Sequence, residues 1–181
     1  MSYCTYVESI RQSEPDNPHI AYHDTQYGFP IEDDNELFGR LILEINQAGL
    51  SWTTILNKQH HFRKAYDGFN IDIIANYNED DFNRLMADAG IIRNRLKINA
   101  AIHNARAIRS LQQEYGSFKQ WIEHHHPKTK QEWVKIFKNT FRFTGGEIVN
   151  EFLMSTGYLQ GAHNNGCPIY DEVQKNMGQY L

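Results

Sequence analysis

Glu44 is the side chain whose type and position most clearly suggest chemistry. With about 100° of rotation per residue, it lies roughly 20° from Leu37 on a helical wheel, at the edge of an apolar arc. A carboxylate there either reaches water from the edge of the arc, or is paired, protonated or functional. Trp52 lies one turn beyond Gly49, and Tyr22 lies in an expected early loop. Flat rings beside a buried acid would form a slot for a planar, positively charged base.

Two cysteines and two histidines have the residue types of a metal site. Three residues separate His163 from Cys167, so both side chains can reach one ion across a short loop. His23 lies in an expected loop that could approach Cys4, and two thiolates with two imidazoles satisfy a tetrahedral structural zinc site. Such a site would join the two ends of the chain. The alternative is a pair of unrelated buried cysteines, because two cysteines in 181 residues suit a reducing compartment and disfavour a disulfide.

A second histidine cluster, His124-His125-His126, also suggests metal binding. Consecutive residues point in different directions, so these rings cannot easily share one ion. We interpret the run as solvated. The rival interpretation is a zinc hydrolase that uses these histidines, and it requires an open metal site.

Residues 79–110 indicate two helices joined by a tight turn at Gly90 and Ile91. The second helix, expected from Ile91, has Arg93, Arg95 and Lys97 in its first turns. Because a helix start offers unpaired N–H groups and a positive dipole end, this segment is a candidate phosphate site. An ordinary bundle corner is the alternative.

The distribution of charge supports a polyanion surface, although the net charge is −4. Residues 91–142 carry eleven of the eighteen basic side chains and only three acidic ones. A basic segment inside an acidic chain is typical of a surface that binds nucleic acid. A set of solvated helix faces is the alternative.

The elements that must position these side chains are all helical, because strand-like alternation is nowhere sustained. Three early prolines (Pro15, Pro18 and Pro30) predict mostly turns and irregular chain over the first 34 residues. No long apolar run or signal peptide is present, so we expect a cytoplasmic protein without a membrane partner. Helices are expected at 35–48, from 51, at 72–75, 79–89, 91–111, 118–124, 130–139 and 147–157.

Several segments together resemble the DNA-3-methyladenine glycosylase I family of the helix-hairpin-helix DNA glycosylase superfamily. They are IAYHDTQYGFP at 20–30, LILEINQAGLSWTTIL at 41–56, LMADAGIIRNRLKINAAIHNARA at 85–107 and FTGGEIVNEFLMSTGYLQGAHNNGCP at 143–168, with Cys4-x-Tyr6 before them. The similarity spans nearly the full chain.

This resemblance implies an all-α helix-hairpin-helix glycosylase fold: a single unit over residues 1–181 with two helical lobes, a hairpin at about 79–110 and a zinc site that joins the termini. It implies that Cys4, His23, His163 and Cys167 hold one structural Zn²⁺. It implies that Glu44, as the catalytic residue, hydrogen-bonds the flipped base and that Tyr22, Trp52 and Tyr6 shape the pocket. It implies a duplex-filling turn containing Gly49 and Leu50, and a DNA-binding hairpin containing Gly90, Ile91 and Arg93.

The implied reaction releases free 3-methyladenine from double-stranded alkylated DNA. Many relatives in the superfamily carry an Asp some twenty residues after the hairpin, whereas this chain has no Asp between Asp88 and Asp171. We therefore expect a monofunctional monomer that leaves an abasic site and forms no Schiff base. The family usually has Trp where this chain has Tyr6 and Tyr27, and a different pair where it has Gly146-Glu147. These departures motivate an alternative, a non-catalytic protein that binds DNA lesions or DNA structures.

Overall fold

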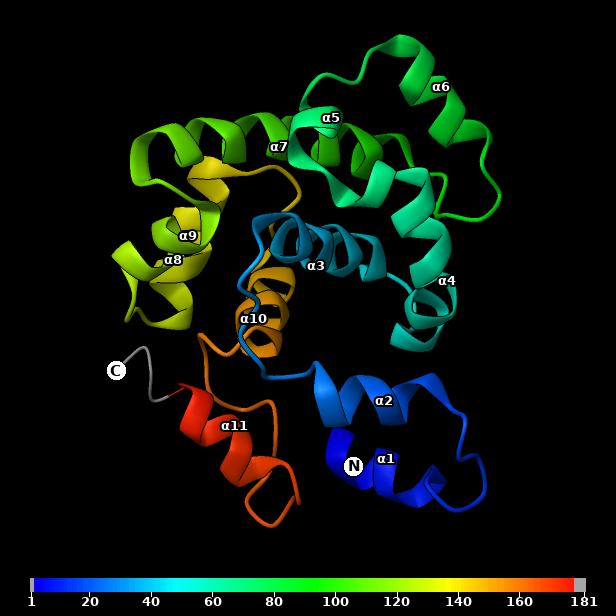
Figure 1. The fold of residues 1–181 in the computed structure, drawn as a ribbon, viewed down its shortest axis with the longest axis vertical. Coiled ribbons are helices and arrows are strands. Elements are labelled where there is room, and N and C mark those ends of the chain that lie inside the picture. The colour runs from blue at the N-terminus through cyan, green and yellow to red at the C-terminus, as the bar shows by residue number, and fades with distance from the viewer. Residues whose placement is uncertain (1, 178–181) are drawn as a thin grey trace.

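The computed structural model describes residues 2–177 and shows an all-helical chain in which α3 occupies the centre (Figure 1). Within these residues there is no strand, as the sequence predicts. The helices are α1 (Tyr3–Ile10), α2 (Pro18–Thr25), α3 (Asp34–Gln47), α4 (Trp52–Ala65), α5 (Ile71–Ala75), α6 (Glu79–Ala87), α7 (Arg95–Tyr115), α8 (Phe118–His125), α9 (Lys130–Thr140), α10 (Gly146–Ser155) and α11 (Tyr170–Met177), with a 3-10 turn η1 (Asp67–Phe69) after α4.

The first 34 residues contain two helices, so the prediction of mostly irregular chain is wrong. Ser2 caps α1 by accepting a hydrogen bond from the Thr5 N–H. Asn17 caps α2, and Pro18 stands at its first position, where a missing N–H costs nothing. Pro18 therefore begins a helix, whereas Pro15 and Pro30 lie in the connections before α2 and α3. Tyr22 and His23 consequently lie on a helix, and not in a loop.

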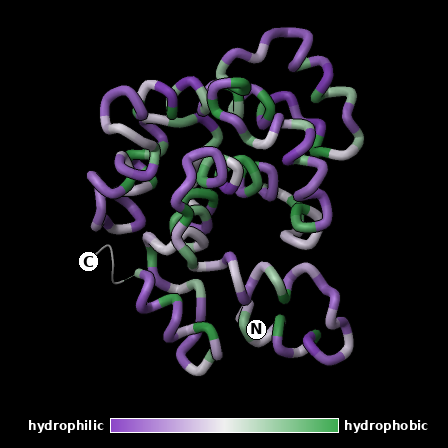
Figure 2. Tube along the Cα trace, viewed as in Figure 1, coloured by the Kyte–Doolittle hydropathy of each residue, from purple (hydrophilic) through white to green (hydrophobic). Residues whose placement is uncertain are grey.

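Helix α3 is almost entirely buried because neighbours cover it on several sides. Asp33 caps it by accepting a hydrogen bond from the Glu36 N–H, and α4, α7, α8 and α10 all pack against it. Hydrophobic residues concentrate on the central helices, whereas the outer ones are largely hydrophilic (Figure 2). Two charged residues of α3, Arg40 and Glu44, are buried within this apolar surrounding. Gly49 follows the helix with φ +81°, the left-handed conformation that ends helices and suits glycine.

Helices α6 and α7 follow one another in the chain, and the connection between them is longer than the sequence predicts. Asn78 caps α6 in a capping box with Asp81. The second helix begins at Arg95 and not at Ile91, because the Asn94 side chain accepts hydrogen bonds from two N–H groups of the first turn. Arg93 therefore lies in the connection.

The C-terminal segment adds a helix that the sequence pattern did not predict. Helix α10 begins at Gly146 and ends at Ser155, close to the expected range, but α11 (Tyr170–Met177) follows it. The N-terminal helices and α11 lie at the same end of the molecule (Figure 1). Within residues 2–177, no helix combines the length and apolarity needed to cross a membrane.

Candidate functional site

Glu44 points into the protein and lines a cavity, as a carboxyl group that binds a flipped base must do. Only 4% of the residue is exposed, and the Ser155 hydroxyl donates a hydrogen bond of 3.5 Å to its Oε1. Burial raises the pKa of Glu44 to about 8. The negative charge of Glu151 also raises this pKa, whereas the positive charge of Arg40 and the Ser155 hydrogen bond lower it. At neutral pH the carboxyl group is therefore mostly protonated.

The cavity beside Glu44 has a volume of about 430 Å³ and mainly aromatic walls. The ring centroids of Tyr22 and Trp52 are 5.1 Å apart with an interplanar angle of 56°. The Trp52 indole N–H is buried and has no hydrogen-bond partner within the described residues, so it can donate to a bound molecule. The complete lining is Tyr3, Tyr22, Tyr27, Glu44, Gln47, Trp52, Glu147 and Glu151.

Of the predicted aromatic residues, Tyr22 and Trp52 line the cavity and Tyr6 does not. Tyr6 stacks on Tyr3, with ring centroids 6.4 Å apart, and Tyr3 supplies the wall instead. The two residues are three positions apart on α1, so they lie on one face of the helix, and only Tyr3 reaches inward. Tyr27 completes the wall and packs edge-on against Tyr3 at 5.2 Å.

Two further carboxylates line the cavity from α10, and sequence reasoning did not assign them to it. Glu151 accepts a hydrogen bond of 3.4 Å from the Tyr27 hydroxyl, and burial raises the pKa of Glu151. Glu147 lies one turn earlier on the same helix face. This repeat of Glu at positions i and i+4 is the signal that could have placed both side chains together. The cavity is consequently a site for a flat molecule with positive charge.

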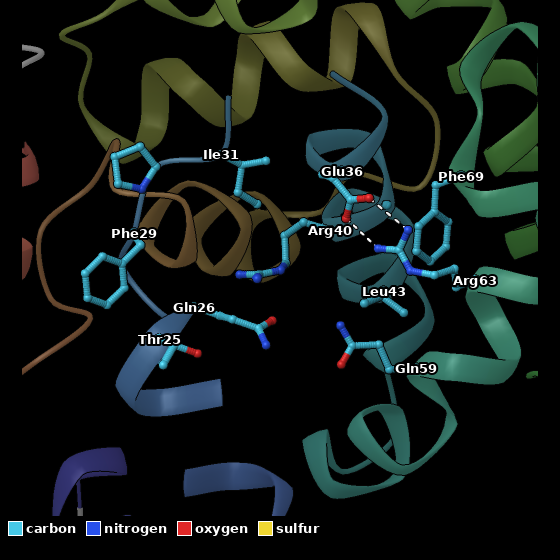
Figure 3. A pocket seen from close by; sticks show the side chains of 12 residues that line it. Thr25, Gln26, Phe29, Ile31, Glu36, Arg40, Leu43, Gln59, Arg63 and Phe69 are labelled. Carbon is cyan, nitrogen blue, oxygen red and sulfur yellow. Dashed lines mark hydrogen bonds and ion pairs between the residues drawn. The ribbon is translucent and has the colours of Figure 1, made fainter. Parts of the chain in front are cut away.

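A second cavity of about 340 Å³ shares no lining residue with the first (Figure 3). Arg40 lines it, and in this view the guanidinium group lies above Gln26. On its far side Arg63 pairs with Glu36 through two hydrogen bonds. With two arginines and one paired carboxylate, this cavity does not suit a cationic base.

Cys4, His23, His163 and Cys167 come together as one group, as predicted, with their donor atoms within 4.8 Å of one another. The Sγ of Cys167 lies 3.4 Å from Nδ1 of His163 and 3.7 Å from Nε2 of His23, and Cys4 Sγ lies 3.7 Å from Nδ1 of His163. Sulfur and nitrogen atoms bound to one tetrahedral zinc are separated by about 3.6 Å, given bonds of about 2.3 and 2.1 Å. The four residues therefore fit a zinc ion. Within residues 2–177 they are the only such group of histidine, cysteine and acidic side chains.

The other nitrogen of each histidine is already engaged, as in zinc proteins. His163 donates from Nε2 to the Tyr27 carbonyl at 2.8 Å, and His23 donates from Nδ1 to Asp24 at 2.8 Å. Arg11 holds Asp24 through two hydrogen bonds of 2.8 and 3.0 Å, and lowers the pKa of that carboxyl group to about 2. These contacts turn the remaining nitrogen of each ring toward the two sulfur atoms.

The turn after α3 is exposed, and a buried lysine holds it. Leu50 is 39% exposed, which is unusual for a large apolar side chain. Lys97 Nζ donates hydrogen bonds to the carbonyls of Asn46 (2.9 Å) and Ala48 (2.7 Å), and lies 5.9 Å from the centroid of the Phe143 ring. Lys97 is only 5% exposed, so the expectation that it lies at a phosphate site is wrong.

The hairpin offers a smaller phosphate site than predicted. Arg93 is exposed, but Ile91 is buried in the core, so its side chain cannot reach a ligand. The Gly90 N–H donates to the Asp88 side chain at 2.7 Å, and Lys58 donates to the carbonyls of residues 89 and 90. Of Gly90, Ile91 and Arg93, only Arg93 is exposed.

Comparisons with known proteins agree with this geometry. The profile of the methyladenine glycosylase family matches residues 12–136. DNA-3-methyladenine glycosylase 1 of Escherichia coli (strain K12) is 35% identical over 171 residues, covering 84% of this chain and 91% of that protein. The Haemophilus influenzae DNA-3-methyladenine glycosylase is 32% identical over 169 residues, covering 83% and 91%.

Solved structures show the same relationship. A crystal structure of 3-methyladenine DNA glycosylase I superimposes with a TM-score of 0.76 at 34% identity, covering 84% of this chain and 94% of that one. A variant of 3-methyladenine DNA glycosylase I in complex with 3-methyladenine gives 0.78 at 29% identity, covering 87% and 94%. The aromatic, acidic cavity and the Cys/His group thus occur in a chain that, by sequence and fold, belongs to the methyladenine glycosylase family.

Proposed function

We propose that this protein is a DNA base-excision repair glycosylase that flips 3-methyladenine out of alkylated double-stranded DNA and hydrolyses its N-glycosyl bond. The observation that carries the proposal is the buried carboxyl group of Glu44 in a cavity walled by Tyr22 and Trp52. The relatives' names and the 3-methyladenine complex of one neighbour support the same ligand.

Charge provides the discrimination between damaged and normal bases. Methylation at N3 makes adenine cationic while it is attached to the sugar. A cation beside Glu44 stabilises the carboxylate, so binding below pH 8 is accompanied by loss of the carboxyl proton. Normal adenine offers no such compensation for burial, and its pairing makes flipping more costly than for a damaged base. Trp52 Nε1 and the Tyr22 hydroxyl add polar contacts at the cavity wall.

The bond cleavage then needs little acid–base assistance. The glycosidic electron pair moves to the cationic base, which leaves as neutral 3-methyladenine. Water adds to the sugar C1′ and loses a proton, which gives an abasic site. No lysine lines the cavity within residues 2–177, so the mechanism we propose is monofunctional and has no Schiff base.

The Cys4, His23, His163 and Cys167 group would hold a structural zinc ion. The zinc ion would link residues from both ends of the chain through four strong bonds. With four protein ligands no position stays open for water, so a zinc hydrolase is not favoured. Within the described residues, His124 to His126 form no cluster that could hold a metal.

Two exposed segments would hold the duplex. The turn of Gly49 and Leu50 would fill the gap that the flipped base leaves, since Leu50 is apolar and projects into solvent. Arg93 would contact phosphate from the hairpin connection. Because Asn94 already accepts from the first N–H groups of α7, the phosphate contact falls on the connection and not on the helix start.

The test is the release of free base from duplex DNA treated with a methylating agent. Chromatography should detect 3-methyladenine in the supernatant with the parent protein and at least about 100-fold less with Glu44→Gln, in proportion to a lost charge contact of about 3 kcal/mol. A matched control is Glu147→Gln, which removes an exposed carboxylate near the mouth of the same cavity. Binding of methylated DNA without release by the parent would instead establish the non-catalytic alternative.

A further inference from the structure

Arg40 is a buried cation in the wall between the two cavities, and the proposed reaction gives it no role. It is 6% exposed and lies within an apolar run of α3, next to the fully buried Leu41. No carboxylate of the described residues lies within 4.0 Å of its guanidinium group. Burying such a charge costs several kcal/mol unless other groups compensate for it.

The contacts of Arg40 lead to the base cavity. Its Nη1 donates to the Tyr22 hydroxyl at 3.2 Å and to the Ser155 carbonyl at 3.4 Å. Ser155 in turn donates from its hydroxyl to Glu44 Oε1 at 3.5 Å. Arg40 thus contacts the aromatic wall directly through Tyr22, and it is connected to Glu44 through Ser155.

The contact with Arg40 excludes one direction for the hydroxyl proton of Tyr22. An arginine can only donate, so the Tyr22 oxygen must be the acceptor. The tyrosine proton is then directed elsewhere, and Tyr22 lines the base cavity. The guanidinium carbon also lies 5.0 Å from the centre of the Tyr22 ring, which holds the ring against Trp52.

The charge of Arg40 favours the ionised form of Glu44. The two residues are one helical turn apart on α3, on the same side of the helix. Of the other charged groups near the cavity, Glu151 of α10 raises the pKa of Glu44, and Glu147 is paired with Lys130. The tyrosines that line the cavity carry no positive charge. Arg40 is therefore the nearby cation that counters the burial of the acid.

We propose that Arg40 is a positioning residue of the base cavity, which supplies the buried positive charge that lets Glu44 ionise and holds Tyr22 and Ser155 around it. This inference rests on the proposed function of the cavity. It assigns a role in base selection to a residue that does not line the cavity and does not touch the base.

Two matched variants separate charge from hydrogen bonding. Arg40→Gln keeps a donor toward Tyr22 and Ser155 but removes the charge, whereas Arg40→Lys keeps the charge and loses the planar fork. Ionisation of Glu44 is followed by carbon-13 NMR of the labelled carboxyl groups, with Glu44→Gln used to assign the signal. The midpoint of the Glu44 titration should rise by at least one pH unit in Arg40→Gln. In Arg40→Lys it should stay within about half a pH unit of the parent value.

An unchanged midpoint in Arg40→Gln would overturn the proposal. Should that variant fail to fold, Arg40→Met, which leaves no polar group to bury, is measured in the same way. The pH profile of base release gives a second readout: in Arg40→Gln it should shift to higher pH, whereas a merely structural defect would lower release equally at every pH. Because the NMR titration needs no catalysis, a parent protein that titrates as described but releases no base would refute the proposed function alone.

Discussion

Replacing Glu44 with Gln should stabilise the fold, and the gain should grow with pH. The pKa of Glu44 is about 8 in the folded protein because the carboxyl group is buried, against an ordinary value of 4.5 in the unfolded chain. Between these values the folded state holds a proton that the unfolded state has lost, so rising pH destabilises the parent. Gln has the same shape, keeps a partner for Ser155 and does not titrate.

The size of the effect follows from the two pKa values. Each pH unit between them corresponds to about 1.4 kcal/mol, so the gain from Glu44→Gln should increase by about 3 kcal/mol between pH 5.5 and pH 9. Above pH 8 the gain should level off. Base release should fall in the same variant, so stability and activity change in opposite directions.

Urea unfolding followed by circular dichroism at several pH values measures this difference directly. Comparing variant with parent at each pH cancels the titration of all other groups, including the metal ligands. The control Glu147→Gln, at a side chain that is 86% exposed, should change the free energy of unfolding by less than about 0.5 kcal/mol. If the difference between Glu44→Gln and the parent stays constant from pH 5.5 to pH 9, the carboxyl group is not buried as described and the reasoning fails.

Three further results are expected. Elemental analysis should find one zinc ion per chain. Cys4→Ser should lower the melting temperature by at least about 5 °C, because several kcal/mol of metal-binding free energy is lost. A protein that is purified without zinc and is equally stable after chelation would contradict the zinc assignment. Lys97→Met should leave two carbonyls unpaired and cost about 1–3 kcal/mol of stability. It should reduce base release from duplex DNA more than it reduces binding of free 3-methyladenine, which is measured by fluorescence titration. Equal losses in both assays would argue against the role of Lys97 in the turn. Leu50→Ala should leave the melting temperature nearly unchanged, since the side chain is exposed, and lower duplex cleavage about tenfold or more; full activity in a cleavage assay would exclude this residue as the duplex-filling group.

The sequence predicted the parts of the site that depend on local periodicity. Glu44 could be placed because a helical wheel shows an acid at the edge of an apolar arc, and the structure confirms that it is buried. The same test applied to Arg40, about 40° from Glu44 on the wheel, would have revealed the buried cation as well. Asp33 and Asn78 cap α3 and α6 by local rules of the same kind.

Tertiary packing decided the features that were missed. Nothing local distinguishes Tyr3 from Tyr6, because the angle at which α1 packs selects the ring that reaches the cavity. Lys97 looked like a phosphate ligand because it follows a helix start, yet its partners are carbonyls about fifty residues earlier in the chain. The prolines near the N-terminus predict irregular chain, although Pro18 begins a helix.

Tyr22 and His23 are consecutive residues of α2, one in the wall of the base cavity and the other in the Cys/His group. Under the proposed zinc assignment, the rigidity of the recognition surface depends on two sulfur atoms at opposite ends of the chain. Thiolates are strong nucleophiles, and the reagents that methylate adenine also methylate sulfur. Methylation of either cysteine would remove a ligand and loosen the helix that carries Tyr22. Heavy exposure to such reagents would thus disable the repair protein while creating more of its substrate.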